Sequence, residues 1–345
     1  MRELTEKKKL LKETIKVGVA SCLLGKRVRY NAGDKYDEFI VETLGHFFDW
    51  VPVCPEFEVG FGVPRESMRL VKKGNTQRLV TVLTNRDLTD EMLPFCEKRV
   101  IALKKMGLRG YILKKASPSC GMDRVRVYQK SGIPSHDGRG LFAAALMTSE
   151  PSLPVEEEGR LHNPVLRENW VERVFAYHDL KNLLDSPWSL GDLVKFQTRY
   201  KLVLLSHSTV KYQELGRLVA NAKGKPRKEF AKAFEREFMM ALSVPATTKK
   251  HTNVLQHMLG YLKKDLDSSS KRDILSTIDD YRLGLYPLSV PVTLLRHFIQ
   301  RYATNYLLDQ VYLNPHPKEL ALRNFIPAGD SAASKRPTLR PRAVD

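Results

Sequence analysis

Lys16-Val17-Gly18-Val19-Ala20-Ser21-Cys22 is a short apolar run that ends at a cysteine, and runs of this kind determine the fold of the first half of the chain. Their length and composition are typical of buried β-strands. Comparable runs follow at residues 50–53, 79–83 and 111–113, and a last short strand is expected within residues 151–158. Helical spacing separates these runs at residues 37–48 and 89–106, and Gly107 closes the second helix.

This alternation of strands and helices predicts an α/β domain, Rossmann-like, with a parallel sheet covered by helices on both faces. Residues 132–140 are polar and contain glycines, which favours a loop that leads into a helix at 141–147.

The second half of the chain has a different pattern. From Trp170 onward the sequence is almost continuously helical, which predicts an all-α domain with breaks at Pro187, Gly224-Lys225-Pro226, Pro245, Pro287 and Pro291. A small, polar, Pro- and Arg-rich tail follows and is expected to be disordered. We therefore expect an α/β domain at 1–163, a helical domain at 164–326 and a tail at 327–345.

The charge is strongly positive. The 345 residues contain 57 Lys and Arg against 39 Asp and Glu, a net charge of +18. An excess of this size favours a polyanionic partner, with nucleic acid ahead of an anionic membrane, although a basic proteome alone also produces it. The sequence has no apolar run of about eighteen residues, and its charged N-terminus lacks the apolar core of a secretory signal. A cytoplasmic protein is expected.

Three of the four cysteines follow predicted strands. Cys22, Cys54 and Cys120 each come after the carboxyl end of an apolar run, where ligands bind in open parallel sheets. Spacing alone leaves open whether they are three unrelated buried thiols or a metal site, because no CxxC pair is present. Structural zinc usually takes four ligands, whereas three cysteines and an open position suit an iron–sulfur cluster. Cys96 lies within a helix and is expected to be a packed thiol.

The motifs around these cysteines resemble a known family. Four motifs recur in order within residues 15–160 and are similar to those of thiouracil desulfidase (TudS-like) domains: residues 19–25, 29–33, 51–56 and 117–121. Residues 193–217 resemble the helical YbgA-like domain. A fusion of the two resembles the RudS-type tRNA 4-thiouridine desulfidases of bacteria. Asn31-Ala32 and residues 57–61 depart from the usual TudS-like pattern, and these loops are expected to shape the choice of substrate.

The resemblance implies a [4Fe–4S] cluster on Cys22, Cys54 and Cys120 with one open iron, and removal of sulfur from a thiolated base without redox change. This chemistry needs proton transfer to and from water and the ring. Glu56 is the candidate for that transfer, Ser117 for positioning water, and Ser119 stands second to Ser117. The alternatives are a helix-start acid for Glu56 and a turn cap for Ser117.

Basic residues outside the cysteine motifs are candidates for holding RNA phosphates. Tyr200 and Tyr212 are interleaved with some of them and are candidates for base stacking, the alternative being core tyrosines with solvated cations. His207 is expected to be structural. The candidate cations are Lys114, Lys115, Arg199, Lys201, Lys211 and Arg217.

Together these features predict a tRNA desulfidase that converts 4-thiouridine to uridine and releases hydrosulfide, with tRNA as its partner. Two alternatives remain. One is a desulfidase of free thiouracil whose helical half serves oligomerisation. The other is an RNA-binding protein with a structural metal site and no catalysis.

Overall fold

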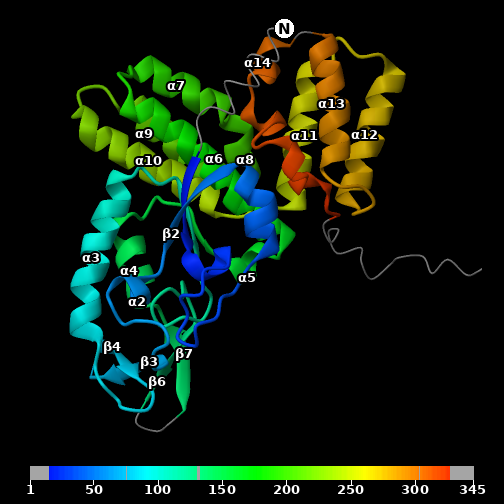
Figure 1. The fold of residues 1–345 in the computed structure, drawn as a ribbon. Helices are drawn as coiled ribbons and strands as arrows, with labels where there is room; N and C mark the ends of the chain where they lie inside the picture. The colour runs from blue at the N-terminus through cyan, green and yellow to red at the C-terminus, as the bar shows by residue number, and fades with distance from the viewer. Residues whose placement is uncertain (1–14, 75, 130–132, 303, 327–345) are drawn as a thin grey trace, which may run out of the picture. The chain divides into compact units, whose positions relative to one another are not determined.

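The computed structural model describes residues 15–74, 76–129, 133–302 and 304–326 (Figure 1). The tail predicted at 327–345 lies outside the described residues. The chain divides into two compact units, Met1–Lys181 and Asn182–Asp345. The domain boundary predicted between residues 163 and 164 lies at the start of helix α6, Pro164–Asp185, whereas the boundary between the two compact units lies between Lys181 and Asn182, near the end of that helix.

The first unit is built on a four-stranded parallel sheet. Its strands lie in the order β2 (Phe48–Val53), β1 (Ile15–Ala20), β5 (Gly110–Leu113) and β8 (Val155–Glu157). All three neighbouring pairs are parallel. Every residue of β5 is buried, as expected for a strand covered on both faces. The predicted parallel α/β domain is therefore confirmed.

Helices cover both faces of this sheet. The ring of Tyr111 lies 5.7 Å from that of Phe142 in α4 (Leu141–Ser149), which packs against α3 (Thr89–Lys105). The preceding residue, Gly110, faces α6, where an added Cβ would lie only 2.8 Å from Val174. Because successive residues of a strand point to opposite faces, α4 and α6 lie on opposite sides of β5. Gly110 is required for the close approach of α6.

A second sheet extends the first unit and was not predicted. Its order is β4 (Thr76–Thr81), β3 (Met68–Lys73), β6 (Val125–Tyr128) and β7 (Pro134–Gly138), with antiparallel pairs at β3–β4 and β6–β7. Placing residues 79–83 in the parallel sheet was therefore wrong, because an apolar run does not indicate which sheet it joins. The prediction of a loop at 132–140 was also wrong for the residues that form β7, because pairing with β6 holds these polar residues in a strand.

Short helical segments connect the strands of the first unit. The helical stretch predicted at 37–48 forms a π-helical turn, η2 (Phe39–Thr43), and a 3-10 turn, η3 (Leu44–His46). The others are η1 (Ser21–Leu24), α2 (Pro55–Glu58) and α5 (Glu158–Leu161).

The second unit is helical, as predicted. Phe196, Tyr200, Phe234 and Phe238 form an aromatic core between its first helices. The break predicted at Pro291 is wrong, because this residue lies in the first turn of a helix, where its missing N–H has no helical partner to lose. The helices are α7 (Leu190–Arg199), α8 (Lys201–His207), α9 (Thr209–Ala220), α10 (Arg227–Ser243), α11 (Thr248–Leu262), α12 (Ser268–Arg282), α13 (Ser289–Arg301) and α14 (Asn305–Leu308), followed by the 3-10 turns η4 (Val311–Leu313), η5 (Lys318–Leu320) and η6 (Leu322–Asn324).

Candidate active site

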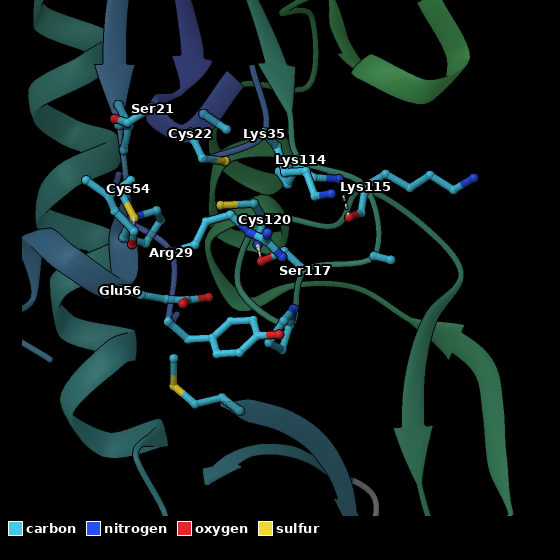
Figure 2. A pocket seen from close by; sticks show the side chains of 18 of the residues that line it. Ser21, Cys22, Arg29, Lys35, Cys54, Glu56, Lys114, Lys115, Ser117 and Cys120 are labelled. Atoms are coloured by element: carbon cyan, nitrogen blue, oxygen red, sulfur yellow. Dashed lines mark hydrogen bonds between the residues drawn. The ribbon is translucent and has the colours of Figure 1, made fainter. Parts of the chain in front are cut away.

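Three cysteines meet at the carboxyl ends of three adjacent strands. Cys54 follows β2 directly, Cys22 lies in η1 just after β1, and Cys120 lies in the loop after β5. All three line one pocket of about 340 Å³, a volume in the range of small-molecule sites. Figure 2 shows their side chains turned toward a common space. The sequence expectation that these thiols converge is met, while Cys96 is buried in α3 and does not line the pocket.

The backbone around Cys22 folds tightly. Gly25 ends η1 in the left-handed conformation, with φ 81°, and its N–H donates to the Cys22 carbonyl at 3.3 Å. The same carbonyl accepts a hydrogen bond from the Lys35 N–H at 2.9 Å. Residues 26–35 therefore form a loop that returns to Cys22.

Cys54 caps a short helix. Its carbonyl accepts from the N–H groups of Phe57 at 3.1 Å and Glu58 at 2.9 Å, and its own N–H donates to Glu58 Oε1 at 2.9 Å. Pro55 occupies the first helical position, where proline is preorganised for a helix. These contacts fix the backbone that carries both Cys54 and Glu56.

The loop that holds Cys120 is locked against α4. Ser117 Oγ accepts hydrogen bonds from the N–H groups of Ser119 at 3.2 Å and Cys120 at 3.0 Å, which is the turn-cap role. The Ser119 carbonyl in turn accepts from Phe142 at 3.0 Å, in the first turn of α4. An added Cβ on Gly140 would lie 2.5 Å from the Ser119 carbonyl, so only glycine allows this close packing.

Burial and mutual repulsion hold the three thiols in their neutral form. Burial and, after it, the charge of a thiolate at Cys54 raise the pKa of Cys22 to about 11, although the charges of Lys114 and Arg29 oppose this shift. Burial also raises the pKa of Cys54 and, together with the charges of Cys54, Glu56 and Cys22, that of Cys120. Because each thiolate disfavours the others, three thiolates require positive charge placed among them.

Glu56 lies at the edge of this pocket in a network that orients it. Arg65 donates to Glu56 Oε2 through Nε at 3.2 Å and through Nη2, and Ser119 Oγ donates to Glu56 Oε1 at 2.9 Å. The side chains of Glu56 and Arg65 are only 14% and 6% exposed. Arg65 also donates to the carbonyls of Val28 at 3.0 Å and Gly62 at 2.9 Å.

Arg65 is not among the candidates predicted from the sequence, and Ser119 is predicted there only as second to Ser117. Ser117 lines the pocket, whereas Ser119 is buried behind Glu56 and contacts the pocket through that carboxylate. The sequence feature that could have identified Arg65 is its position next to Pro64, close to the second cysteine. In a chain with 57 Lys and Arg, one more arginine carries little information.

The two predicted lysines of the first unit have different environments. Lys114 lines the pocket and forms an ion pair with Glu158 at 2.5 Å, both side chains being largely buried. Lys115 is exposed, and its N–H donates to the same Glu158 carboxylate at 2.7 Å.

The predicted cations of the second unit do not form one uniform surface. Arg199 and Arg217 are exposed. Lys211 pairs with Glu214 at 2.7 Å, and Lys201 lies 5.8 Å from the ring centre of Tyr306. Tyr200 is buried and stacks on Phe196, so it belongs to the core. His207 is also buried, with Nδ1 2.6 Å from the Val244 carbonyl, which confirms its structural role.

In the part of the chain that the structure describes, no helix combines the length and apolarity needed to cross a bilayer.

Two family models match the chain. Residues 17–158 match the model described as 2-thiouracil desulfurase, and residues 201–317 match one described as a protein of unknown function, DUF1722. The uncharacterized protein YbgA of Escherichia coli (strain K12) is 33% identical over 153 residues, 44% of this chain and 90% of YbgA. The uncharacterized protein YbbK of Bacillus subtilis (strain 168) is 31% identical over 113 residues, 30% of this chain and 71% of YbbK.

A solved structure is also similar. It is described as the [4Fe–4S]-dependent thiouracil desulfidase TudS. The match covers 43% of this chain and 94% of the TudS chain, with 28% sequence identity and a TM-score of 0.35. The chain thus belongs to the 2-thiouracil desulfurase family through its cysteine-bearing domain and joins to it a domain of the YbgA and DUF1722 kind.

Proposed function

We propose that the protein is an iron–sulfur-dependent desulfidase that replaces the sulfur of a thiolated uracil by oxygen, with 4-thiouridine in tRNA as its substrate. The observation that carries this proposal is the pocket lined jointly by Cys22, Cys54, Cys120 and Glu56. It combines soft metal ligands with an oriented carboxylate, and the cysteine-bearing domain matches the 2-thiouracil desulfurase model.

The donor set fits an iron–sulfur cluster. The described residues contain no group of three or more His, Cys, Asp or Glu side chains arranged for a single metal ion. Three thiols lining a wider pocket suit a larger, multi-iron group, for which cysteine thiolates are the usual ligands. Cys22, Cys54 and Cys120 would hold it, and its positive iron ions would relieve the repulsion among their thiolates. When bound, the cluster supplies a Lewis-acidic iron for the thiocarbonyl sulfur.

The residues around the thiols supply the proton chemistry. Replacing C=S by C=O consumes one water and releases hydrosulfide and a proton, with no change of oxidation state. The Glu56 carboxylate accepts the proton of the attacking water and returns it to the ring nitrogen or the leaving sulfur. Arg65 and Ser119 hold this carboxylate in place through its two oxygens. Ser117, which lines the pocket, orients the water.

A tRNA substrate is supported by charge and by the second domain. The chain has a net charge of +18, and Arg199 and Arg217 are exposed on the helical unit. Cations of this kind neutralise phosphates, which a free base does not carry. Residues 201–317 match the DUF1722 model, the chain shares 153 aligned residues with YbgA, and a free thiobase has no evident need for a second domain of this kind.

The second candidate is a desulfidase of free thiouracil. Two observations favour it: the matched family is described by 2-thiouracil, and a pocket of about 340 Å³ accommodates a single base.

One experiment separates the two candidates. Anaerobically reconstituted protein is given thiolated tRNA or free 4-thiouracil at equal thiobase concentration, and released hydrosulfide is measured. We expect a higher kcat/KM with tRNA. A higher kcat/KM with the free base would replace the first candidate by the second.

A further inference from the structure

Tyr111 is a fully buried tyrosine of β5 that does not line the cysteine pocket. Its ring crosses the neighbouring strand β1 directly over Gly18, because an added Cβ on that glycine would lie 2.2 Å from Cδ2 of the ring. On its other side the ring packs against Phe142 of α4, with 5.7 Å between the ring centres. The Phe142 N–H donates to the Ser119 carbonyl at 3.0 Å. Tyr111 is therefore packed against the helix that holds the loop of Cys120.

The hydroxyl of Tyr111 is buried without a hydrogen-bond partner among the described residues. A buried tyrosine hydroxyl normally finds a partner, and leaving such a group unsatisfied costs free energy. Unsatisfied groups of this kind are few in native proteins, and each one calls for a physical explanation, of which a bound group is one. The O–H of Tyr111 is therefore available as a donor to an acceptor that appears when the site is loaded.

The charges that act on this hydroxyl come from the cysteine site. Burial raises the pKa of Tyr111 well above its usual value, and among the neighbouring charges a thiolate at Cys120 raises it most. Glu58 also raises this pKa, but both of its carboxylate oxygens already have partners. Oε1 accepts from the Cys54 N–H at 2.9 Å, and Oε2 lies 2.8 Å from Arg99 Nε. This leaves the sulfur of Cys120 as the acceptor that the Tyr111 hydroxyl can use.

The charge state of Cys120 decides how strong this hydrogen bond is. Burial raises the pKa of Cys120, so in cluster-free protein its thiol is neutral, and a neutral thiol is a weak acceptor. A cysteine that ligates iron is a thiolate, whose negative charge makes it a much stronger acceptor. Hydrogen bonds to ligating sulfurs draw electron density from them and are among the features that set the reduction potential of a cluster.

We propose that the Tyr111 hydroxyl donates a hydrogen bond to the sulfur of Cys120 when that sulfur ligates the cluster, which makes Tyr111 a positioning residue for this ligand. The bond holds the Cys120 side chain in one orientation and withdraws charge from its sulfur. Because the thiolate then donates less charge to the iron, the bond preserves the Lewis acidity that the thiocarbonyl sulfur needs. This inference rests on the proposed function, since it assigns a residue to the cluster named there.

The test replaces Tyr111 by Phe, which keeps the ring and removes only the hydroxyl. Anaerobically reconstituted wild type and Tyr111→Phe are compared by redox titration and by NMR of the cysteine β-protons, whose signals a cluster shifts strongly. We expect full iron content, a more negative reduction potential and altered β-proton signals of Cys120, with smaller changes at Cys22 and Cys54. Tyr128→Phe is the matched control, since this tyrosine of β6 does not line the pocket, and it should change neither readout.

A second measurement compares cluster-free and reconstituted protein by thermal unfolding. In cluster-free protein Tyr111→Phe removes an unsatisfied hydroxyl, so Tm should stay the same or rise. In reconstituted protein the variant lacks one charge-assisted hydrogen bond, so the gain in Tm on loading should be smaller than in wild type. Cluster affinity, measured by competition with an iron chelator, should fall about tenfold.

Three results would overturn the inference. They are an unchanged reduction potential together with unchanged Cys120 signals, changes confined to Cys54, and a cluster-free Tyr111→Phe that melts several degrees below the cluster-free wild type. The last result would show that the hydroxyl already has a partner in the protein or in bound water. None of these readouts needs a substrate. A protein that gives the expected shifts but releases no hydrosulfide from thiolated uracil would therefore keep the role of Tyr111 and lose the proposed function.

Discussion

Replacing Glu56 by Gln tests whether its carboxylate acts in proton transfer. The substitution keeps the size of the side chain and removes its charge. Glu56 now accepts hydrogen bonds from Arg65 on Oε2 and from Ser119 on Oε1. A glutamine has one acceptor oxygen, so it retains one of these two partners and turns an N–H₂ group toward the other.

The structure bounds the effect on stability. The ion pair is mostly shielded from water, with side chains 14% and 6% exposed, but Arg65 keeps its hydrogen bonds to the carbonyls of Val28 and Gly62. Complete removal of one partner of a buried pair costs about 3–5 kcal/mol. A glutamine that preserves part of the network should cost about 1–3 kcal/mol. At about 2–4 °C per kcal/mol, Tm should fall by roughly 2–12 °C.

The effect on rate should be much larger. Loss of a general base slows turnover about 10²- to 10⁴-fold, which is roughly 3–5 kcal/mol of barrier. Since a domain is stabilised by about 5–15 kcal/mol, Glu56→Gln should remain folded at 25 °C, and unfolding does not account for such a loss.

Hydrosulfide release by reconstituted protein and thermal unfolding are measured together. Glu66→Gln is the matched control, because Glu66 also accepts several hydrogen bonds, from Leu83 and Thr84, but does not line the pocket. It should change stability and leave kcat nearly unchanged. A Glu56→Gln variant with full cluster content and a kcat within about threefold of wild type would refute a catalytic role for the carboxylate.

Three further predictions follow from the geometry. Gly140→Ala places a Cβ 2.5 Å from the Ser119 carbonyl and 2.8 Å from the Cys120 nitrogen, so it should lower the free energy of unfolding by about 1–3 kcal/mol and reduce the iron content. Gly260→Ala is the control, because nothing lies within 4 Å of its added Cβ, and it should have neither effect. Normal iron content in Gly140→Ala would contradict the packing argument. Charge reversal at Arg199 and Arg217 should weaken tRNA binding and lower the slope of log affinity against log salt concentration by about 1 per lost phosphate contact. An unchanged slope would show that these two arginines are not part of the RNA-binding surface. Because the thiolate is the reactive form, alkylation of Cys22 in cluster-free protein should rise with pH up to its pKa of about 11, and a plateau near pH 9 in mass spectrometry would be inconsistent with its burial.

The sequence predicts the part of the fold that depends on local pattern. Strands β1 and β2 are apolar runs that end at Ala20, two residues before Cys22, and at Val53, one residue before Cys54. Both the parallel sheet and the convergence of these thiols therefore follow from the chain. Cys120 lies seven residues after β5, and contacts such as the Ser117 turn and the close packing at Gly140 hold its loop at the same pocket.

The missed features depend on long-range pairing. Strand β7 is polar and contains Pro134, and it is ordered by pairing with β6 rather than by its own propensity. The contact of Arg65 with Glu56 joins residues nine positions apart across a loop, which no periodicity marks.

The most direct test of the account is the iron and acid-labile sulfide content of the anaerobically reconstituted protein and its four cysteine variants. We expect about four iron and four sulfide per chain in the wild type. Cys96→Ala should retain both, since Cys96 is a core thiol outside the pocket, while substitution of any pocket cysteine should lose them: Cys22→Ala, Cys54→Ala and Cys120→Ala. Zinc in place of iron, or full iron content after loss of one of these three thiols, would contradict a cluster held by Cys22, Cys54 and Cys120.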